Sequence, residues 1–342
     1  MALLFIDSFD HYATADIFLG KWLSAPGGGM TIQPSSGRRG GGAMRSAAFN
    51  SDMQTPALPA SGSTAIVGAA VQASTLATGR DFLRIALSGA AQASVAMNTS
   101  GFLQAYRGPA SGGTLLGTAT TGALAANTYY YVELKVVIHP STGSIVVRVN
   151  EAEVLNLTGQ NTQGAGSAAW NQVFLNATSA NFVYFDDLYV LDGAGSAPLN
   201  DLLGDCRVDA RYPTGAGATT GWTPSTGANW QNVDDTAPNG DTDYNSTSTV
   251  GATDTFAMQD APVPGALLYG VQLVINHKKS DAGTCAVAPV LRHSGVDYPG
   301  TAFNPSTSYA YRVVPYDTNP GTGAAWTEAG FNAIEAGYKR TA

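Results

Sequence analysis

The chain has 342 residues, of which 17 are Lys or Arg and 25 are Asp or Glu, so 12% are charged and the net charge is −8. Its 40 glycines follow no three-residue period, and Lys and Glu number only five each, which excludes collagen and a mainly helical protein. A hydrophobic content of 44% excludes disorder, and a pI near 4.8 argues against a nucleic-acid-binding protein, which needs a basic face.

The amino terminus predicts no secretory signal, because it has no basic residues before its short apolar run and soon reaches Asp7 and Asp10. The apolar runs are too short for a transmembrane helix. Cys206 and Cys285 have no metal-ligand spacing and are expected to be reduced thiols. We therefore expect a protein made in a cytoplasm, and the length favours two domains.

The first domain is predicted at 1–192 as a series of short strands separated by turn residues. Its clearest unit is 129–139, where Val132 and Leu134 alternate with Glu133 and Lys135, the pattern of a strand with one buried face. The strands that follow form an antiparallel meander, and the whole region is typical of a two-sheet sandwich. The predicted strands are 3–7, 65–72, 82–87, 93–97, 102–106, 129–139, 144–150, 153–157 and 181–191.

Small residues and a proline predict a linker at 193–204, followed by a second, smaller β-rich domain at 205–342. A Gly/Thr/Ser-rich loop is expected at 213–228. Thr327 is a candidate N-cap for one short helix that continues to Glu335. The firmest predicted strands of this domain are 267–276, 285–292 and 309–316.

Catalytic patterns are weak. Glu151 and Glu153 could share a strand face, as in jelly-roll glycoside hydrolases, but the E-x-D-x-x-E pattern of those enzymes is incomplete and a solvated rim is favoured. The glycine-rich segment 37–42 could bind an anion through backbone N–H groups, but a turn between strands is the favoured interpretation. The histidines His11, His139, His277 and His293 lie far apart without a metal-binding motif.

Two candidate binding sites lie in the second domain. Oxygen-bearing side chains gather around an Asn-Gly turn and suit Ca²⁺, although an acidic turn without metal is favoured. Aromatic residues in polar loops suit stacking on sugar rings, and the alternative is that they pin long loops to the domain. The candidate metal ligands are Asp234, Asp235, Asn239, Asp241 and Asp243, and the candidate glycan-binding residues are Tyr212, Trp222 and Trp230.

Two resemblances follow from these segments. The sequences at 129–136, 142–150 and 185–190 resemble the concanavalin A-like, laminin-G-like jelly roll. The sequences at 6–12, 21–22 and 37–42, and in the second half 229–235, 240–244, 319–327 and 332–337, resemble virion structural proteins of tailed bacteriophages. The resemblance implies an all-β fold, in which a concanavalin A-like jelly-roll sandwich precedes the smaller domain and its short C-terminal helix. No catalytic residue is implied.

The expected function is therefore that of a virion structural protein without enzymatic activity. In the favoured version it is a tail-fibre or tail-tip component that contacts host surface polysaccharide. Its expected partners are other virion proteins and copies of itself, with a trimer favoured, and no nucleic acid or membrane insertion is expected. A head-decoration or head-fibre protein that binds the capsid is the alternative, and a carbohydrate hydrolase is a third possibility.

Overall fold

The computed structural model describes residues 2–24, 29–46, 52–76, 81–176 and 182–342. Within these ranges almost all regular structure is β-strand, which confirms the all-β prediction. The chain forms two compact units: unit 1 is Met1–Asp10 with Trp22–Val208, and unit 2 is His11–Lys21 with Asp209–Ala342. Among the described residues, no helix has the length and apolar character needed to cross a membrane.

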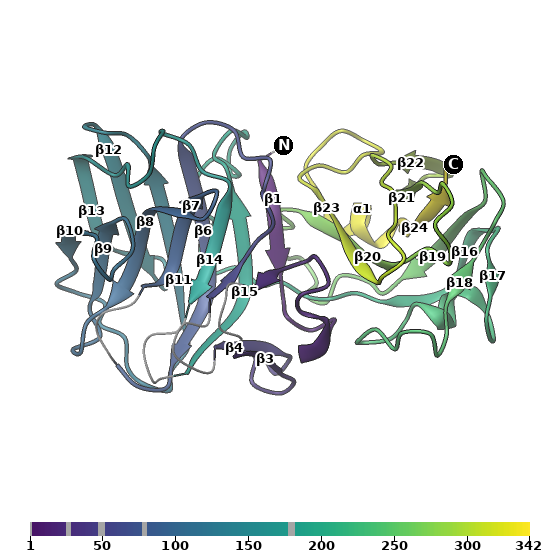
Figure 1. Cartoon of the computed structure of the whole chain (residues 1–342), viewed down its shortest axis with the longest axis horizontal. Coiled ribbons are helices and arrows are strands. Elements are labelled where there is room, and N and C mark those ends of the chain that lie inside the picture. The colour runs from purple at the N-terminus through teal and green to yellow at the C-terminus, as the bar shows by residue number, and fades with distance from the viewer. Residues whose placement is uncertain (1, 25–28, 47–51, 77–80, 177–181) are drawn as a thin grey trace. The chain divides into compact units, whose positions relative to one another are not determined.

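Unit 1 is built from two antiparallel sheets, here called sheet A and sheet B (Figure 1). In order across it, sheet A contains β13 (Ala152–Gln160), β12 (Gly143–Val149), β11 (Tyr130–Val137), β6 (Thr64–Ala73), β15 (Val183–Leu191), β4 (Ala43–Ser46) and β3 (Met30–Gln33), with β1 (Leu3–Asp7) also pairing with β15. Sheet B contains β10 (Thr114–Thr118), β9 (Leu103–Arg107), β8 (Ala90–Met97), β7 (Asp81–Leu87), β14 (Gln172–Asn176), β5 (Asp52–Gln54) and β2 (Leu23–Ser24). The presence of two antiparallel sheets agrees with the predicted two-sheet sandwich.

The predicted meander is confirmed. β11 pairs with β12, and β12 pairs with β13, all antiparallel. Val132, Leu134 and Val136 are buried, as their spacing predicts. Apolar side chains of sheet B such as Leu83 and Val95 are buried as well, and removal of this apolar surface from water stabilises the sandwich.

The opposite face of β11 is partly buried, whereas the sequence predicts that it faces solvent. Glu133 is expected to face solvent, yet its exposed fraction is 0%. The reason is the segment 199–208, predicted in part as a linker, which lies over this face: Leu199, Leu202, Leu203 and Cys206 pack against the buried cluster that contains Tyr131 and Tyr189. We call this segment the strap. It belongs to unit 1, whereas 11–21 belongs to unit 2, so the division differs from the predicted one at both ends.

Unit 2 contains three smaller sheets. The five-stranded sheet contains β16 (Pro213–Thr220), β19 (Thr253–Met258), β24 (Ile334–Arg340), β21 (Val287–His293) and β22 (Val296–Pro299). Two further pairs are β17 (Thr223–Pro224) with β18 (Asn245–Ser246), and β20 (Val271–His277) with β23 (Ala310–Tyr316). The short helices are η1 (Thr14–Asp16), η2 (Asn229–Asn232) and α1 (Glu328–Asn332).

Two predictions for unit 2 need correction. The expected loop 213–228 begins with the strand β16, which is the edge strand of the five-stranded sheet and pairs with β19. The helix begins as predicted, because the Thr327 hydroxyl accepts a hydrogen bond from Gly330 N. It ends at Asn332, however, and Ile334 and Glu335 already belong to β24, whose pairing with β19 and β21 outweighs the local helical pattern.

Candidate functional site

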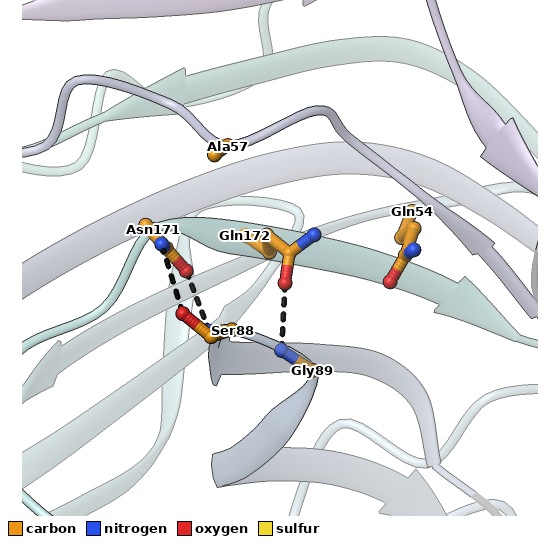
Figure 2. Close-up of a pocket in the computed structure, with 6 residues that line it drawn as sticks. All are labelled: Gln54, Ala57, Ser88, Gly89, Asn171 and Gln172. Carbon is orange, nitrogen blue, oxygen red and sulfur yellow. Dashed lines mark hydrogen bonds between the residues drawn. The ribbon is translucent and has the colours of Figure 1, made fainter.

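One hollow on sheet B has a volume of about 340 Å³ and is called hollow 1. Three segments that are distant in the sequence supply it: the end of β5, the turn between β7 and β8, and the start of β14 (Figure 2). Its lining residues are Gln54, Ala57, Ser88, Gly89, Asn171 and Gln172. All six have uncharged side chains, so the hollow is polar and neutral.

The turn that borders hollow 1 is a two-residue hairpin. Ser88 and Gly89 both have positive φ angles, 48° and 85°, as a type I′ turn requires, and a glycine at the second position adopts this conformation without steric cost. The turn is fixed to β14 by two side-chain amides. Asn171 Oδ1 accepts from Ser88 N at 2.8 Å, and Gln172 Oε1 accepts from Gly89 N at 2.7 Å (Figure 2).

Gln54 differs from the other amides of hollow 1. Its side chain is partly exposed and makes no hydrogen bond with any described residue, and Figure 2 draws it on the neighbouring strand beside Gln172. An amide offers two N–H donors and one carbonyl acceptor. Together with the Ser88 hydroxyl, it supplies donors and acceptors of the kind that match sugar hydroxyl groups, without a charge that would select an ion.

The second hollow on sheet B, hollow 2, has a volume of about 190 Å³. Its lining residues are Asp52, Asp81, Arg84, Pro109, Ser111 and Asn176. Asp81 is nearly fully buried and accepts hydrogen bonds from Arg84 Nε at 2.6 Å, Asn176 Nδ2 at 2.8 Å and Ala110 N at 3.1 Å. The Asp52 side chain is held less firmly than that of Asp81, because its ion pair with Arg84 is longer, at 3.5 Å.

The predicted aromatic site lies in unit 2, where the structure gives its members different surroundings. Trp222 packs its ring edge-on against Tyr338 at 4.7 Å, and its Nε1 donates to Ala252 O at 3.1 Å. Trp230 is half-buried in η2. Tyr212 is also half-buried, and its backbone bonds to Gln259. The contacts of Trp222 are those of a side chain that holds a loop in place.

The acidic turn does not gather its carboxylates around one point. Asn239 Nδ2 donates to Asp235 Oδ2 at 2.7 Å and to Asp243 Oδ1 at 2.8 Å, so an amide donor lies between them. Asp241 pairs instead with Lys278 at 2.6 Å and accepts from Tyr309 at 2.8 Å. Asp234, the remaining predicted ligand, makes no hydrogen bond with Asn239, Lys278 or Tyr309. In the described ranges no group of three His, Cys, Asp or Glu residues is placed to hold a metal ion, and the Ca²⁺ site stays a prediction.

The remaining sequence candidates make hydrogen bonds within the chain. Glu151 lies in a turn with φ of 68° and accepts from Asp205 N, while Glu153 accepts from Asn156, and both are exposed. The segment 37–42 is the predicted turn, because it joins β3 to β4. Its backbone N–H groups do bind carboxylates of this chain: Gly42 N donates to Asp10 at 2.6 Å, and Arg38 N donates to Asp186 at 2.7 Å.

Comparison with known proteins gave distant structural similarities only. No protein-family model matches the chain, and no curated protein matches its sequence. A sialidase is similar with a TM-score of 0.36 and 11% identity over 56% of this chain, which spans only 19% of the sialidase. The carbohydrate-binding module CBM66 from Bacillus subtilis is similar with a TM-score of 0.34 and 11% identity, over 50% of this chain and 95% of the module.

A third similarity is to a conserved carbohydrate esterase from the Shiga toxin-encoding bacteriophage phi24B. Its TM-score is 0.35 at 14% identity, over 55% of this chain and 99% of the esterase. All three similarities are too distant to identify a function for this chain. The candidate site therefore depends on the geometry of hollow 1.

Proposed function

We propose that this protein is a non-catalytic, glycan-binding structural protein of a tailed-bacteriophage virion, and that hollow 1 contacts the glycan. The observation that carries the binding role is the neutral hollow on sheet B, in which the Gln54 side chain makes no hydrogen bond with a described residue. Neighbouring groups, the Asn171 amide and the Ser88 hydroxyl, are held in place by the hairpin contacts. A site that is already ordered binds with less loss of conformational entropy.

The virion role is supported by the sequence resemblance to tailed-phage structural proteins and by the low content of charged residues, 12%, which suits broad packed interfaces. We favour a tail-fibre or tail-tip component that assembles as a homotrimer with other virion proteins. Host surface polysaccharide is then the ligand. A head-decoration protein with the same resemblance is the alternative.

Binding without cleavage is the proposed activity because glycoside hydrolysis requires a pair of positioned carboxylates. The side chains that line hollow 1 include none. Glu151 and Glu153, the carboxylates that the sequence offers, are exposed on and beside a turn of sheet A. Incubation with oligosaccharides is expected to release no products, and release that stops in Glu151→Gln or Glu153→Gln would overturn this part of the proposal.

The glycan-binding role is tested with a glycan array followed by titration of the bound sugars. Gln54→Ala is the informative variant, because it removes an amide of hollow 1 that makes no hydrogen bond with any described residue. We expect affinity to fall about tenfold, the loss of one or two hydrogen bonds, with an unchanged unfolding midpoint. Asn156→Ala, which removes an exposed amide on β13 of sheet A, is the matched control.

Unchanged binding by Gln54→Ala to every array sugar would reject hollow 1 as the glycan site. The placement on the particle needs a separate measurement. Immunogold electron microscopy of source particles with antibody against this chain is expected to label the tail. Label over the head would support the decoration protein instead, and unlabelled particles would contradict the virion role.

A further inference from the structure

Hollows 1 and 2 lie along the same strand and on the same face of sheet B. Because side chains alternate along a strand, Gln172, Phe174 and Asn176 of β14 share one face. Asp52 and Gln54 of β5 pair with Asn176 and Phe174, so they lie on that face too. Gln172 lines hollow 1 and Asn176 lines hollow 2. Gln172 and Asn176 are four positions apart on the strand, so their side chains lie about 13 Å apart.

Polar groups continue between the two hollows. Phe174 lies between Gln172 and Asn176 on β14 and is 4% exposed. On one side it pairs with Gln54, which lines hollow 1. On the other side it pairs with Arg84, which lines hollow 2 and whose guanidinium lies 5.2 Å from the centre of the Phe174 ring. The ring is therefore covered, and an amide and a guanidinium connect the hollows.

Hollow 2 is lined by one acceptor that has no hydrogen-bond donor among the described residues. Asn176 is 1% exposed, and its Nδ2 donates to Asp81. Its Oδ1 is buried and has no hydrogen-bond partner within the described part of the chain. A buried acceptor without a partner costs free energy, which a bound donor recovers. Asp52 adds a carboxylate whose ion pair with Arg84 is long, at 3.5 Å.

We propose that hollows 1 and 2 are two subsites of one groove along β14, which binds a linear oligosaccharide rather than a single sugar. The sugar unit in hollow 2 directs hydrogen-bond donors toward Asp52 and Asn176. This inference rests on the proposed glycan-binding function and specifies its ligand. A single sugar ring is too small to reach both hollows, whereas linked units gain from the second contact because it forms within the bound complex.

The test is calorimetric titration of the full chain with ladders of one to six units of gluco-, manno-, galacto- and N-acetylglucosamine oligosaccharides. We expect Kd to fall by about tenfold or more as the chain grows long enough to reach hollow 2, and then to level off. Asp52→Ala should remove this gain and leave the binding of the shortest members unchanged. Gln54→Ala should weaken every member that binds.

Asp260→Asn, an exposed carboxylate of unit 2, serves as the control for a change of charge. Asp52→Asn, which keeps the size of the side chain, replaces Asp52→Ala if that variant unfolds. Affinity that is independent of length, or a length gain that survives both Asp52 variants, overturns the two-subsite groove while the glycan-binding role stands. If no ladder member and no array sugar binds, the inference falls together with the proposed function.

Discussion

Both outer faces of the unit 1 sandwich carry polar side chains, but one face is covered by another segment of the chain and the other is open. On sheet A the strap covers the face, and Glu133, Tyr131 and Tyr189 are buried beneath it. On sheet B the face keeps two hollows with polar side chains around them. A polar residue on a strand therefore indicates an outer face, but it does not indicate whether that face is open.

The covered face satisfies one oxygen of Glu133 internally, while Glu133 Oε2 is buried without a hydrogen-bond partner among the described residues. Tyr189 donates to Glu133 Oε1 at 2.6 Å, and Gly204 N of the strap donates to the same oxygen at 2.8 Å. Burial, with the Glu133 carboxylate nearby, raises the pKa of the Cys206 thiol to about 12, so this cysteine is held as a thiol. Both cysteines are free in the structure, as the sequence predicts. On the open face Asn176 Oδ1 is likewise buried without a hydrogen-bond partner among the described residues, and the Gln54 side chain is partly exposed.

The largest expected effect comes from breaking the covered face. Arg38 is 12% exposed and joins Asp187 at 3.1 Å to Asp205 of the strap at 2.6 Å. Arg38→Ala leaves the buried Asp187 carboxylate without this cation and should lower the free energy of unfolding of unit 1 by about 3–5 kcal/mol. Denaturant unfolding followed by circular dichroism measures the change.

Arg39→Ala is the matched control for that variant. Its side chain is 46% exposed and reaches the same carboxylates only at 4.0 and 3.5 Å. An exposed pair of this kind contributes less than about 1 kcal/mol. Equal losses in the two variants would show that the strap does not depend on the buried ion pair.

The framework of this contrast is visible in the sequence. The alternation in 129–139, with the turns that follow it, predicts β11, β12 and β13 and the buried side of each. The capping role of Thr327 is likewise local chemistry and is confirmed. The strap is not predictable in this way, because its cover over Glu133 depends on contacts between residues about 70 positions apart, such as Gly204 with Glu133.

Hollow 1 escapes sequence reasoning for the same reason. Gln54, Ser88 and Gln172 meet only through the pairing of β5, β14 and β7, and each is unremarkable in its own segment. The one available signal is the Ser88-Gly89 pair between the predicted strands 82–87 and 93–97, which marks a hairpin but no site. Tryptophans in loops are easier to select from the sequence as candidate sugar-binding residues, although Trp222 makes packing contacts in unit 2.

The second largest expected effect is that of a Trp222 variant, which distinguishes a packing role of this side chain from a binding role. Trp222→Ala removes the contact with Tyr338 and the hydrogen bond to Ala252 and should lower the free energy of unfolding by about 2–3 kcal/mol. Binding to array sugars should be unchanged, in contrast to Gln54→Ala on the open face. Loss of sugar binding with an unchanged unfolding midpoint would move the glycan site to Trp222, Trp230 and Tyr212.

The smallest expected effect concerns the acidic turn, in which Asp235, Asp241 and Asp243 already have hydrogen-bond donors. Asn239 bridges Asp235 and Asp243, and Lys278 pairs with Asp241, so a cation would have to displace an amide and an ammonium group. EDTA should leave the melting temperature unchanged, and Asp241→Asn should lower it only slightly, because this exposed pair is screened by solvent. A fall in melting temperature with EDTA that added Ca²⁺ reverses, and that Asp241→Asn reproduces, would show that these side chains rearrange around a metal ion. Partial burial of Asp235, with the Asp243 and Asp234 carboxylates nearby, raises the pKa of this group.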